Sequence, residues 1–89
     1  MAKYRLVVTS GFERDLRKTK KNLQIKLIDM LEELSMNPFT RSGLNIKKLA
    51  GFRLGRYRLR VGDYRVTYDV AGKDIIIYAV KHRKDIYKR

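Results

Sequence analysis

Arginines at alternate positions give this sequence its clearest chemical signal. Arg56, Arg58 and Arg60 are two residues apart, and Arg65 follows a short turn, all within the stretch LGRYRLRVGDYRVTYDV from Leu54 to Val70. Side chains two residues apart share one face of a β-strand, so three of these guanidinium groups should lie side by side. A guanidinium stays charged at physiological pH and can bind two phosphate oxygens at once. The pattern therefore predicts a strand surface that binds phosphate.

The same stretch predicts a β-hairpin that turns at Gly62-Asp63. A two-residue turn there places Val61 opposite Tyr64 and Arg60 opposite Arg65. In this register the apolar and aromatic side chains share the other face; they are Tyr57, Leu59, Val61, Tyr64, Val66 and Tyr68. Like charges directly opposed across two strands are destabilising, so we expect the arginines to serve an anion outside the hairpin.

The overall charge points to the same kind of partner. The chain has 22 Lys and Arg against 9 Asp and Glu, a net charge of +13 in 89 residues. Nucleic acid is the first candidate partner, followed by an anionic membrane or an acidic protein. A solvated, thermostable surface is the alternative, but such surfaces usually mix both signs.

Composition also limits the protein class. The length predicts one domain over residues 1–89. With no cysteine and a single histidine, we expect no disulfide framework, no metal site and no cofactor. The longest apolar run, Ile75 to Val80, is far shorter than the roughly 20 residues of a membrane span. No signal-peptide pattern precedes the first strand, so we expect a cytoplasmic protein without a membrane partner.

The first half of the chain predicts one strand and two helices. Tyr4 to Val8 alternates like a strand, and Ser10 with Glu13 has capping-box spacing for a short helix that begins near Gly11. A stronger helix follows, with Asn22 as its cap and Asn37-Pro38 as its end. Its apolar stripe should pack on the sheet; the stripe is Leu23, Leu27, Met30, Leu31 and Leu34.

The second half predicts a loop and three strands. We interpret Phe39 to Phe52 as a connecting loop that sends Leu49 into the core and carries Lys47-Lys48, a solvated pair or the flank of a phosphate site. The hairpin follows, and Ile75 to Val80 is the last strand, apolar as in a covered or central strand. The order is therefore β-α-α-β-β-β. It predicts an α+β fold with a mainly antiparallel four-stranded sheet and two helices on one face.

Three motifs carry a family resemblance over essentially the whole chain. They are KKLAG at Lys47 to Gly51, YRLRVGDYRVTY at Tyr57 to Tyr68, and HRKDIY at His82 to Tyr87. With the element order, they resemble the RelE/ParE toxin superfamily, most closely its RelE-like branch. The resemblance implies a toxin that enters the ribosomal A site, cuts mRNA there and is held inactive by a cognate antitoxin. ParE-like members share the fold but act on DNA gyrase, so the fold alone does not decide the activity.

The resemblance also assigns residues. The family's basic hairpin residues match Arg58 and Arg60, the arginine of its GYR-type motif matches Arg65, its late arginine matches Arg83, and its C-terminal tyrosine matches Tyr87. Some active members have lysine where this chain has Arg58 and Arg60. The interval from Arg83 to Tyr87 is also shorter than in some of them.

Metal-independent RNA cleavage needs a base for the ribose 2′-hydroxyl, an acid for the leaving oxygen, and positive charge at the phosphate. Arginine suits the last task but cannot serve as a base, because its pKa is above about 12. Tyr87 and His82 remain as competing bases. Arg83 would stabilise the leaving oxygen or act as the acid that the resemblance implies. The catalytic candidates are thus Arg65, Arg83, Tyr87 and His82, and the phosphate-binding candidates are Arg56, Arg58, Arg60, Lys47 and Lys48.

The sequence is compatible with three functions. A ribosome-dependent endoribonuclease toxin accounts for both the arginine face and Tyr87. A ParE-like gyrase inhibitor would bind without cutting RNA, and a degenerate toxin would remain a basic RNA-binding module. For the toxins we expect an antitoxin that is acidic or carries an amphipathic helix, laid on the helices, on the arginine face or along an exposed sheet edge.

Overall fold

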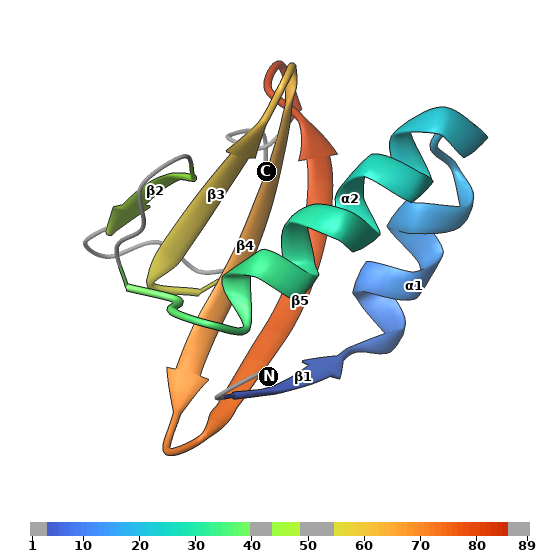
Figure 1. Ribbon diagram of the computed structural model, residues 1–89. Coiled ribbons are helices and arrows are strands. Elements are labelled where there is room, and N and C mark those ends of the chain that lie inside the picture. Colours follow the sequence, from blue (N-terminus) through green and yellow to red (C-terminus); the bar gives the residue numbers. More distant parts are fainter. Residues whose placement is uncertain (1–3, 40–43, 49–54, 86–89) are drawn as a thin grey trace.

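A five-stranded sheet with two helices on one face forms the protein (Figure 1). The computed structural model describes residues 4–39, 44–48 and 55–85. Along the chain the elements are β1 (Arg5–Val8), α1 (Ser10–Arg17), α2 (Lys21–Leu34), β2 (Asn45–Lys48), β3 (Tyr57–Val61), β4 (Tyr64–Ala71) and β5 (Asp74–His82). The strand order is β1-β5-β4-β3-β2. β1 runs parallel to β5, and the other neighbours are antiparallel.

The α+β class, the two helices and the mainly antiparallel sheet agree with the sequence prediction, but the predicted strand count was wrong. The segment Asn45–Lys48, predicted as loop, is a fifth strand paired with β3. It has four residues, of which Asn45, Lys47 and Lys48 are exposed, so it lacks a buried apolar stripe. Its strand conformation comes from pairing with β3, which local sequence does not reveal. Leu49, predicted to enter the core, lies outside the described residues.

Both predicted helix caps were wrong. Thr9, not Ser10, caps α1: its hydroxyl oxygen accepts the Phe12 N–H at 3.2 Å, and Ser10 is already the first helical residue. The Thr9 hydroxyl also donates to the Ile77 carbonyl of β5 at 2.8 Å, a tertiary contact that Ser10 does not make. The N-cap of α2 is Lys20, without a side-chain cap.

The ends of α2 therefore differ from the prediction as well. The helix starts at Lys21, so Asn22 lies inside it, and it ends at Leu34 with Ser35 as C-cap, three residues before Asn37. A second polar side chain, Gln24, donates to the Leu16 and Thr19 carbonyls at 3.0 and 2.9 Å. These bonds satisfy carbonyl groups between the two helices, which ties α2 to the end of α1.

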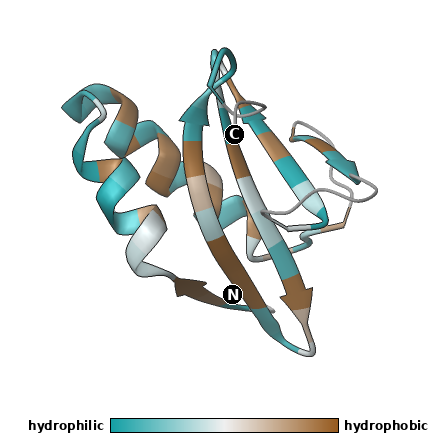
Figure 2. Cartoon of the chain, turned by 180° about the vertical axis from the view of Figure 1, so that it is seen from behind, coloured by the Kyte–Doolittle hydropathy of each residue, from teal (hydrophilic) through white to brown (hydrophobic). Residues whose placement is uncertain are grey.

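The predicted hairpin register is confirmed. Val61 pairs with Tyr64, and Arg60 pairs with Arg65. The apolar face of the hairpin packs under α2 in one core, whose buried members include Leu27, Leu31, Leu34, Leu59, Val66, Tyr68, Ile75 and Ile77. Seen from behind (Figure 2), the sheet stands in front of the helices. One face of the sheet is thus the core, and the other is turned away from both helices.

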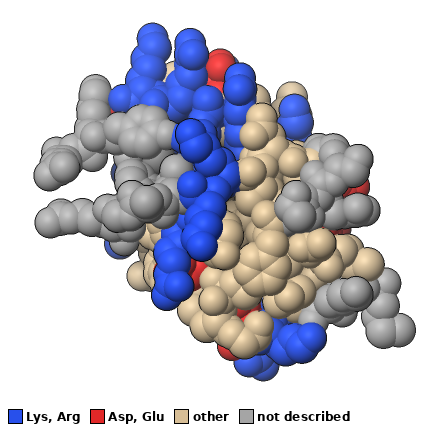
Figure 3. All heavy atoms as spheres, turned by 90° about the vertical axis from the view of Figure 1, so that its left-hand side faces the viewer, with Lys and Arg blue, Asp and Glu red and all other residues tan. Residues whose placement is uncertain are grey.

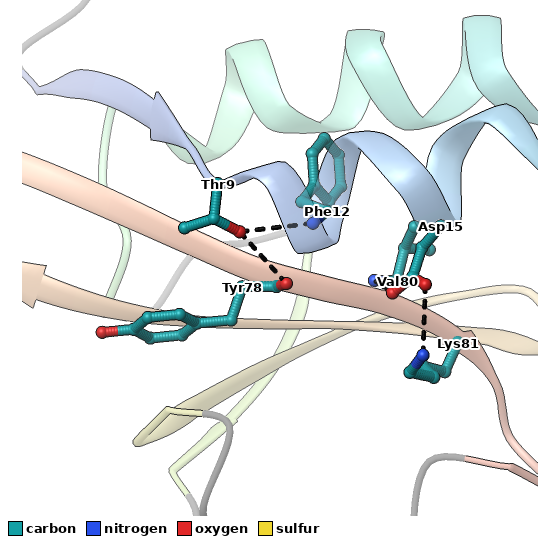
Figure 4. A network of polar contacts seen from close by, with 6 residues as sticks. All are labelled: Thr9, Phe12, Asp15, Tyr78, Val80 and Lys81. Carbon is teal, nitrogen blue, oxygen red and sulfur yellow. Dashed lines mark hydrogen bonds and ion pairs between the residues drawn. The ribbon is translucent and has the colours of Figure 1, made fainter.

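Helix α1 contacts the edge of β5 beyond the point where β1 ends. β1 pairs with β5 only up to Ile77. Beyond that point, one carboxylate oxygen of Asp15 accepts the Val80 N–H at 3.2 Å, and the other accepts the Lys81 ammonium at 3.1 Å (Figure 4). A side chain on α1 therefore satisfies a donor that a longer β1 would have paired.

Candidate nucleic-acid interface

Cationic side chains gather on the sheet face turned away from the helices. Directly opposed residues share a face, and the register opposes Lys47 to Arg58 on β2 and β3, and Arg60 to Arg65 on β3 and β4. We define the basic face as these four residues plus Arg83. Figure 3 shows Lys and Arg side chains forming a band over one side of the molecule. The strand pleat therefore brings charges from three strands into one surface.

Arg65 lies at the centre of this surface and is largely buried, with 8% of its surface exposed. Its Nη1 atom donates to the Gly62 and Tyr64 carbonyls, both at 3.0 Å, which fixes the guanidinium under the hairpin turn. Burial lowers the pKa of Arg65, as do the positive charges of Arg60, Arg58 and Arg83, and Asp63 offsets part of this effect. An arginine starts from a pKa so high that it stays charged at neutral pH.

Arg83 joins the cluster through the hairpin tip. Its backbone N–H donates to the Asp63 carbonyl at 2.7 Å, just past the end of β5. Its guanidinium Nε is 3.8 Å from the Asp63 carboxylate, in an exposed ion pair. This long ion pair holds Arg83 next to Arg65 and leaves its guanidinium accessible to a ligand. The structure thus brings together Arg58, Arg60, Arg65 and Arg83.

Other predicted site residues lie elsewhere. His82 pairs with Tyr64 on the helix side of the sheet, with ring centroids 5.4 Å apart, and its Nδ1 atom accepts the Lys84 N–H. Lys48 pairs with Tyr57 on that same side. The structure therefore does not bring His82 or Lys48 to the basic face. Tyr87 lies outside the described residues.

Arg56 lies on the same side of the sheet as the basic face, but it is paired with Asp69. Its backbone N–H donates to the Asp69 carboxylate at 2.8 Å, and its Nε is 3.7 Å from the same oxygen. Lys81 similarly leaves the strand opposite Arg65, yet its ammonium reaches Asp15 on α1. Two acids thus hold the cations at the borders of the surface, and the centre keeps its net positive charge.

A cavity of about 450 Å³ opens between the end of α1 and the end of β5. Its lining mixes both charges with the Tyr64 and His82 rings; it includes Asp15, Lys18, Thr19, Tyr64, His82 and Asp85. This mixed lining distinguishes it from the uniformly cationic basic face. Among residues 4–39, 44–48 and 55–85, no group of three or more His, Cys, Asp or Glu side chains gathers as a metal site.

The basic face can bind and polarise a phosphate. Several guanidinium groups stand on a rigid sheet, and the central one is held by two backbone carbonyls. Fixed cations at a phosphate stabilise the charge that develops when it is attacked. This arrangement lacks a proton acceptor of its own among the five residues that define it, so a catalytic reaction there needs a group from another segment.

Comparison with known proteins identifies the class. Residues 6–87 match the model of the ParE toxin of the type II toxin–antitoxin system parDE. The chain belongs to this family, and within the RelE/ParE superfamily it is RelE-like.

The relatives that support the RelE-like position are archaeal. Toxin RelE3 of Methanocaldococcus jannaschii is 33% identical over 84 residues, which cover 93% of this chain and 94% of that protein. The putative toxin RelE1 of the same organism is 31% identical, with 97% of both chains covered.

Solved structures agree on the fold. The RelE–RelB complex of Pyrococcus horikoshii gives a TM-score of 0.78 at 29% identity, covering 93% of this chain and 98% of that one. The RelB–RelE antitoxin–toxin complex of Methanococcus jannaschii gives 0.74 at 32% identity, covering 91% and 94%. In the described part of this chain, neither helix has the length and apolarity to cross a membrane.

Proposed function

We propose that this toxin is a metal-independent endoribonuclease that cuts mRNA in the ribosomal A site and so stops translation in the cytoplasm. One observation carries the proposal: Arg58, Arg60, Arg65 and Arg83 converge on one face of the sheet, where burial and the positive charges of the other three lower the pKa of Arg65. Opposed arginines cost folding stability, so an anionic ligand gives them a use. The curated relatives are named RelE toxins, which supports the RelE-like activity over other functions of the fold.

In this proposal the ribose 2′-hydroxyl attacks the adjacent phosphorus in line, and the 5′-oxygen leaves to give a 2′,3′-cyclic phosphate. Arg65, rigidly held, and Arg58 and Arg60 beside it stabilise the negative charge on the pentacoordinate phosphate. Arg83, tethered only through Asp63, stabilises the negative charge on the leaving 5′-oxygen or donates the proton that this oxygen takes up. Tyr87 is the proposed base, because His82 lies on the other side of the sheet.

We further propose that a cognate antitoxin holds the toxin inactive. The two archaeal neighbours with the highest TM-scores given above are antitoxin–toxin complexes. An acidic antitoxin would complement the net charge of +13. An amphipathic helix would instead find apolar surface on α2, where Ile25 and Ile28 are 54% and 51% exposed.

Purified toxin, incubated with ribosomes programmed with a defined mRNA, tests the proposal, and primer extension locates the cuts. The wild-type protein should cut within the A-site codon. Arg83→Ala should slow cutting by about 10²- to 10³-fold, the range measured when one group that stabilises transition-state charge is removed. Arg5→Ala is the matched control, since Arg5 is an exposed arginine on β1 that pairs with Asp74. Intact mRNA after incubation with folded wild-type protein would refute the proposal.

The ParE-like alternative rests on the family model, which describes a ParE toxin. In that case the protein binds DNA gyrase and leaves RNA whole. Supercoiling assays with purified gyrase decide between the two. Blocked supercoiling together with uncut mRNA would favour the ParE-like function.

A further inference from the structure

Tyr78 stands on the same side of the sheet as the basic face because of a β-bulge. Thr67 pairs with Ala79 and Tyr68 pairs with Ile77, so Tyr78 has no partner opposite it on β4. A bulge of this kind redirects a side chain and is frequent beside functional sites. The hydroxyl of Tyr78 donates to an Asp69 carboxylate oxygen at 3.2 Å. Figure 4 shows the Tyr78 ring leaving β5 on the side away from α1.

The position of Tyr78 follows from the rows of the sheet. Arg60 with Arg65 forms one row across β3 and β4, and Arg58 with Thr67 forms the next. Asp69, two residues beyond Thr67, adds a third row, at which the Tyr78 hydroxyl is bound. Rows on one face are two residues apart, or about 6.6 Å. The ring therefore lies next to the row of Arg58. Its separation from the central arginines is about the length of one or two nucleotides.

The ring is held in place, and the residue keeps part of its surface exposed. Asp69, which accepts the Tyr78 hydroxyl, also accepts the Arg56 N–H at 2.8 Å, so the acceptor is itself fixed. Burial and the negative charge of Asp69 raise the pKa of Tyr78, which keeps the hydroxyl protonated as a donor. The side chain as a whole is only partly buried. An aromatic ring fixed by its hydroxyl presents its face with little loss of side-chain entropy on binding.

We infer that Tyr78 is a stacking platform for one base of the single-stranded RNA whose phosphates lie on the basic face. This inference rests on the proposed function and adds a binding residue to it. Aromatic rings beside a row of cations are the usual way in which proteins hold single strands. Because its hydroxyl is occupied by Asp69, Tyr78 offers a ring face and no group that reads base edges. The contact should therefore tolerate any base.

A tryptophan reporter tests the contact directly, since the chain has no Trp. Tyr78→Trp should lose fluorescence when it binds a six-nucleotide 2′-O-methyl RNA, which cannot be cut because the nucleophile is blocked. The same oligomer with abasic residues keeps the phosphates and should bind without this quenching. Phe39→Trp is the matched control, because Phe39 is 46% exposed and contacts Tyr57 from the helix side. It should show no quenching.

Affinity separates stacking from a purely structural role. Tyr78→Phe keeps the ring and loses the bond to Asp69, so binding should stay within about 2-fold of wild type. Tyr78→Leu loses the ring, and affinity should fall on the order of 5- to 100-fold, the range for one stacked base. Equal losses in both variants, or no loss with Leu, would overturn the inference, as would equal quenching by the abasic oligomer.

Failure of the stacking role can be distinguished from failure of the proposed endoribonuclease function. A wild-type protein that cuts mRNA on ribosomes but whose Tyr78→Trp variant is not quenched by the RNA overturns the stacking role alone. A protein that neither cuts mRNA nor binds the oligomer overturns the proposed function and this inference with it.

Discussion

Replacing Arg60 should make the protein more stable while it removes a residue of the proposed site. Arg60 is exposed and lies directly opposite Arg65, which is 8% exposed and whose pKa is lowered by burial and by Arg60. A lowered arginine pKa means that the folded state disfavours the charged form. Arg60→Gln removes one of the repelling charges and keeps a long polar side chain, so folding should gain.

The size of the gain follows from general magnitudes for opposed like charges. Two unit charges about 7 Å apart interact by about 0.6 kcal/mol in a water-like dielectric, and opposed like charges in sheets cost about 0.2–1 kcal/mol. We therefore expect a gain of about 0.5–1 kcal/mol in the free energy of unfolding. For a domain of this size, 1 kcal/mol raises Tm by about 4–8 °C. Salt should reduce the gain, because the Debye screening length falls from about 10 Å at 0.1 M salt to about 3 Å at 1 M.

Thermal unfolding followed by circular dichroism, at low and high salt, measures the effect. Arg5→Gln is the control: Arg5 pairs with Asp74 at 3.0 Å, so its loss should bring no gain in Tm. In the ribosome assay the Arg60→Gln protein should cut more slowly. A lower Tm for Arg60→Gln, or a gain that does not depend on salt, would mean that repulsion between these arginines does not destabilise the fold.

Three further changes test the scaffold. Gly55→Ala should destabilise the fold by about 2 kcal/mol or more in denaturant titrations. Gly55 has φ +114°, and an added Cβ would lie 2.6 Å from the Tyr68 carbonyl oxygen. Gly62→Ala is the control and should cost less, because the space around its Cβ is open. Asp15→Ala should lower the free energy of unfolding by about 1–3 kcal/mol, since the Val80 N–H loses its acceptor. Asp15→Asn keeps an acceptor oxygen and should lose less stability. Equal losses in the two variants would contradict the role of Asp15 as acceptor for Val80. Burial raises the pKa of Tyr68, so the folded state favours the neutral phenol. The stability that this gives below pH 10 should fall as the pH rises above 10. Tyr68→Phe should reduce this alkaline loss but lower the stability at pH 7, because the Pro38 carbonyl loses a 2.6 Å hydrogen bond.

The hairpin was predictable from the sequence because two independent signals agree. The alternation from Tyr57 to Val61 and from Tyr64 to Tyr68 fixes which side chains share a face, and Gly62-Asp63 fixes the turn. Gly62 has φ +59°, a conformation that glycine adopts without strain. The grouping of Arg58, Arg60 and Arg65 follows from this register alone.

The remaining features depend on contacts between distant segments. β2 is a strand only because β3 offers it partners, and Thr9 caps α1 partly through β5. The side on which His82 lies requires the length of the last turn and the position of the bulge. The sequence run from Ile75 to Val80 is uniformly apolar, so it gives no sign that Tyr78 turns toward the basic face.

The stability cost and the proposed activity have one origin. The sheet holds Arg65 under the hairpin turn and sets Arg60 against it, an arrangement that folding alone would not favour. Proteins often place such strained or repelling groups where a ligand relieves them. An RNA phosphate on the basic face would offset the repulsion, so RNA should raise Tm more for the wild-type protein than for Arg60→Gln.

The chemistry of the cut ends shows whether the toxin cleaves RNA through the ribose 2′-hydroxyl. An mRNA is presented on programmed ribosomes, and a second reaction uses a copy that carries one 2′-deoxy nucleotide at the cut position. Attack by the 2′-hydroxyl should cut the first mRNA with a 2′,3′-cyclic phosphate at the new end and leave the deoxy position uncut. Cutting of the deoxy copy at the same position, or uncut mRNA of both kinds, would contradict this mechanism.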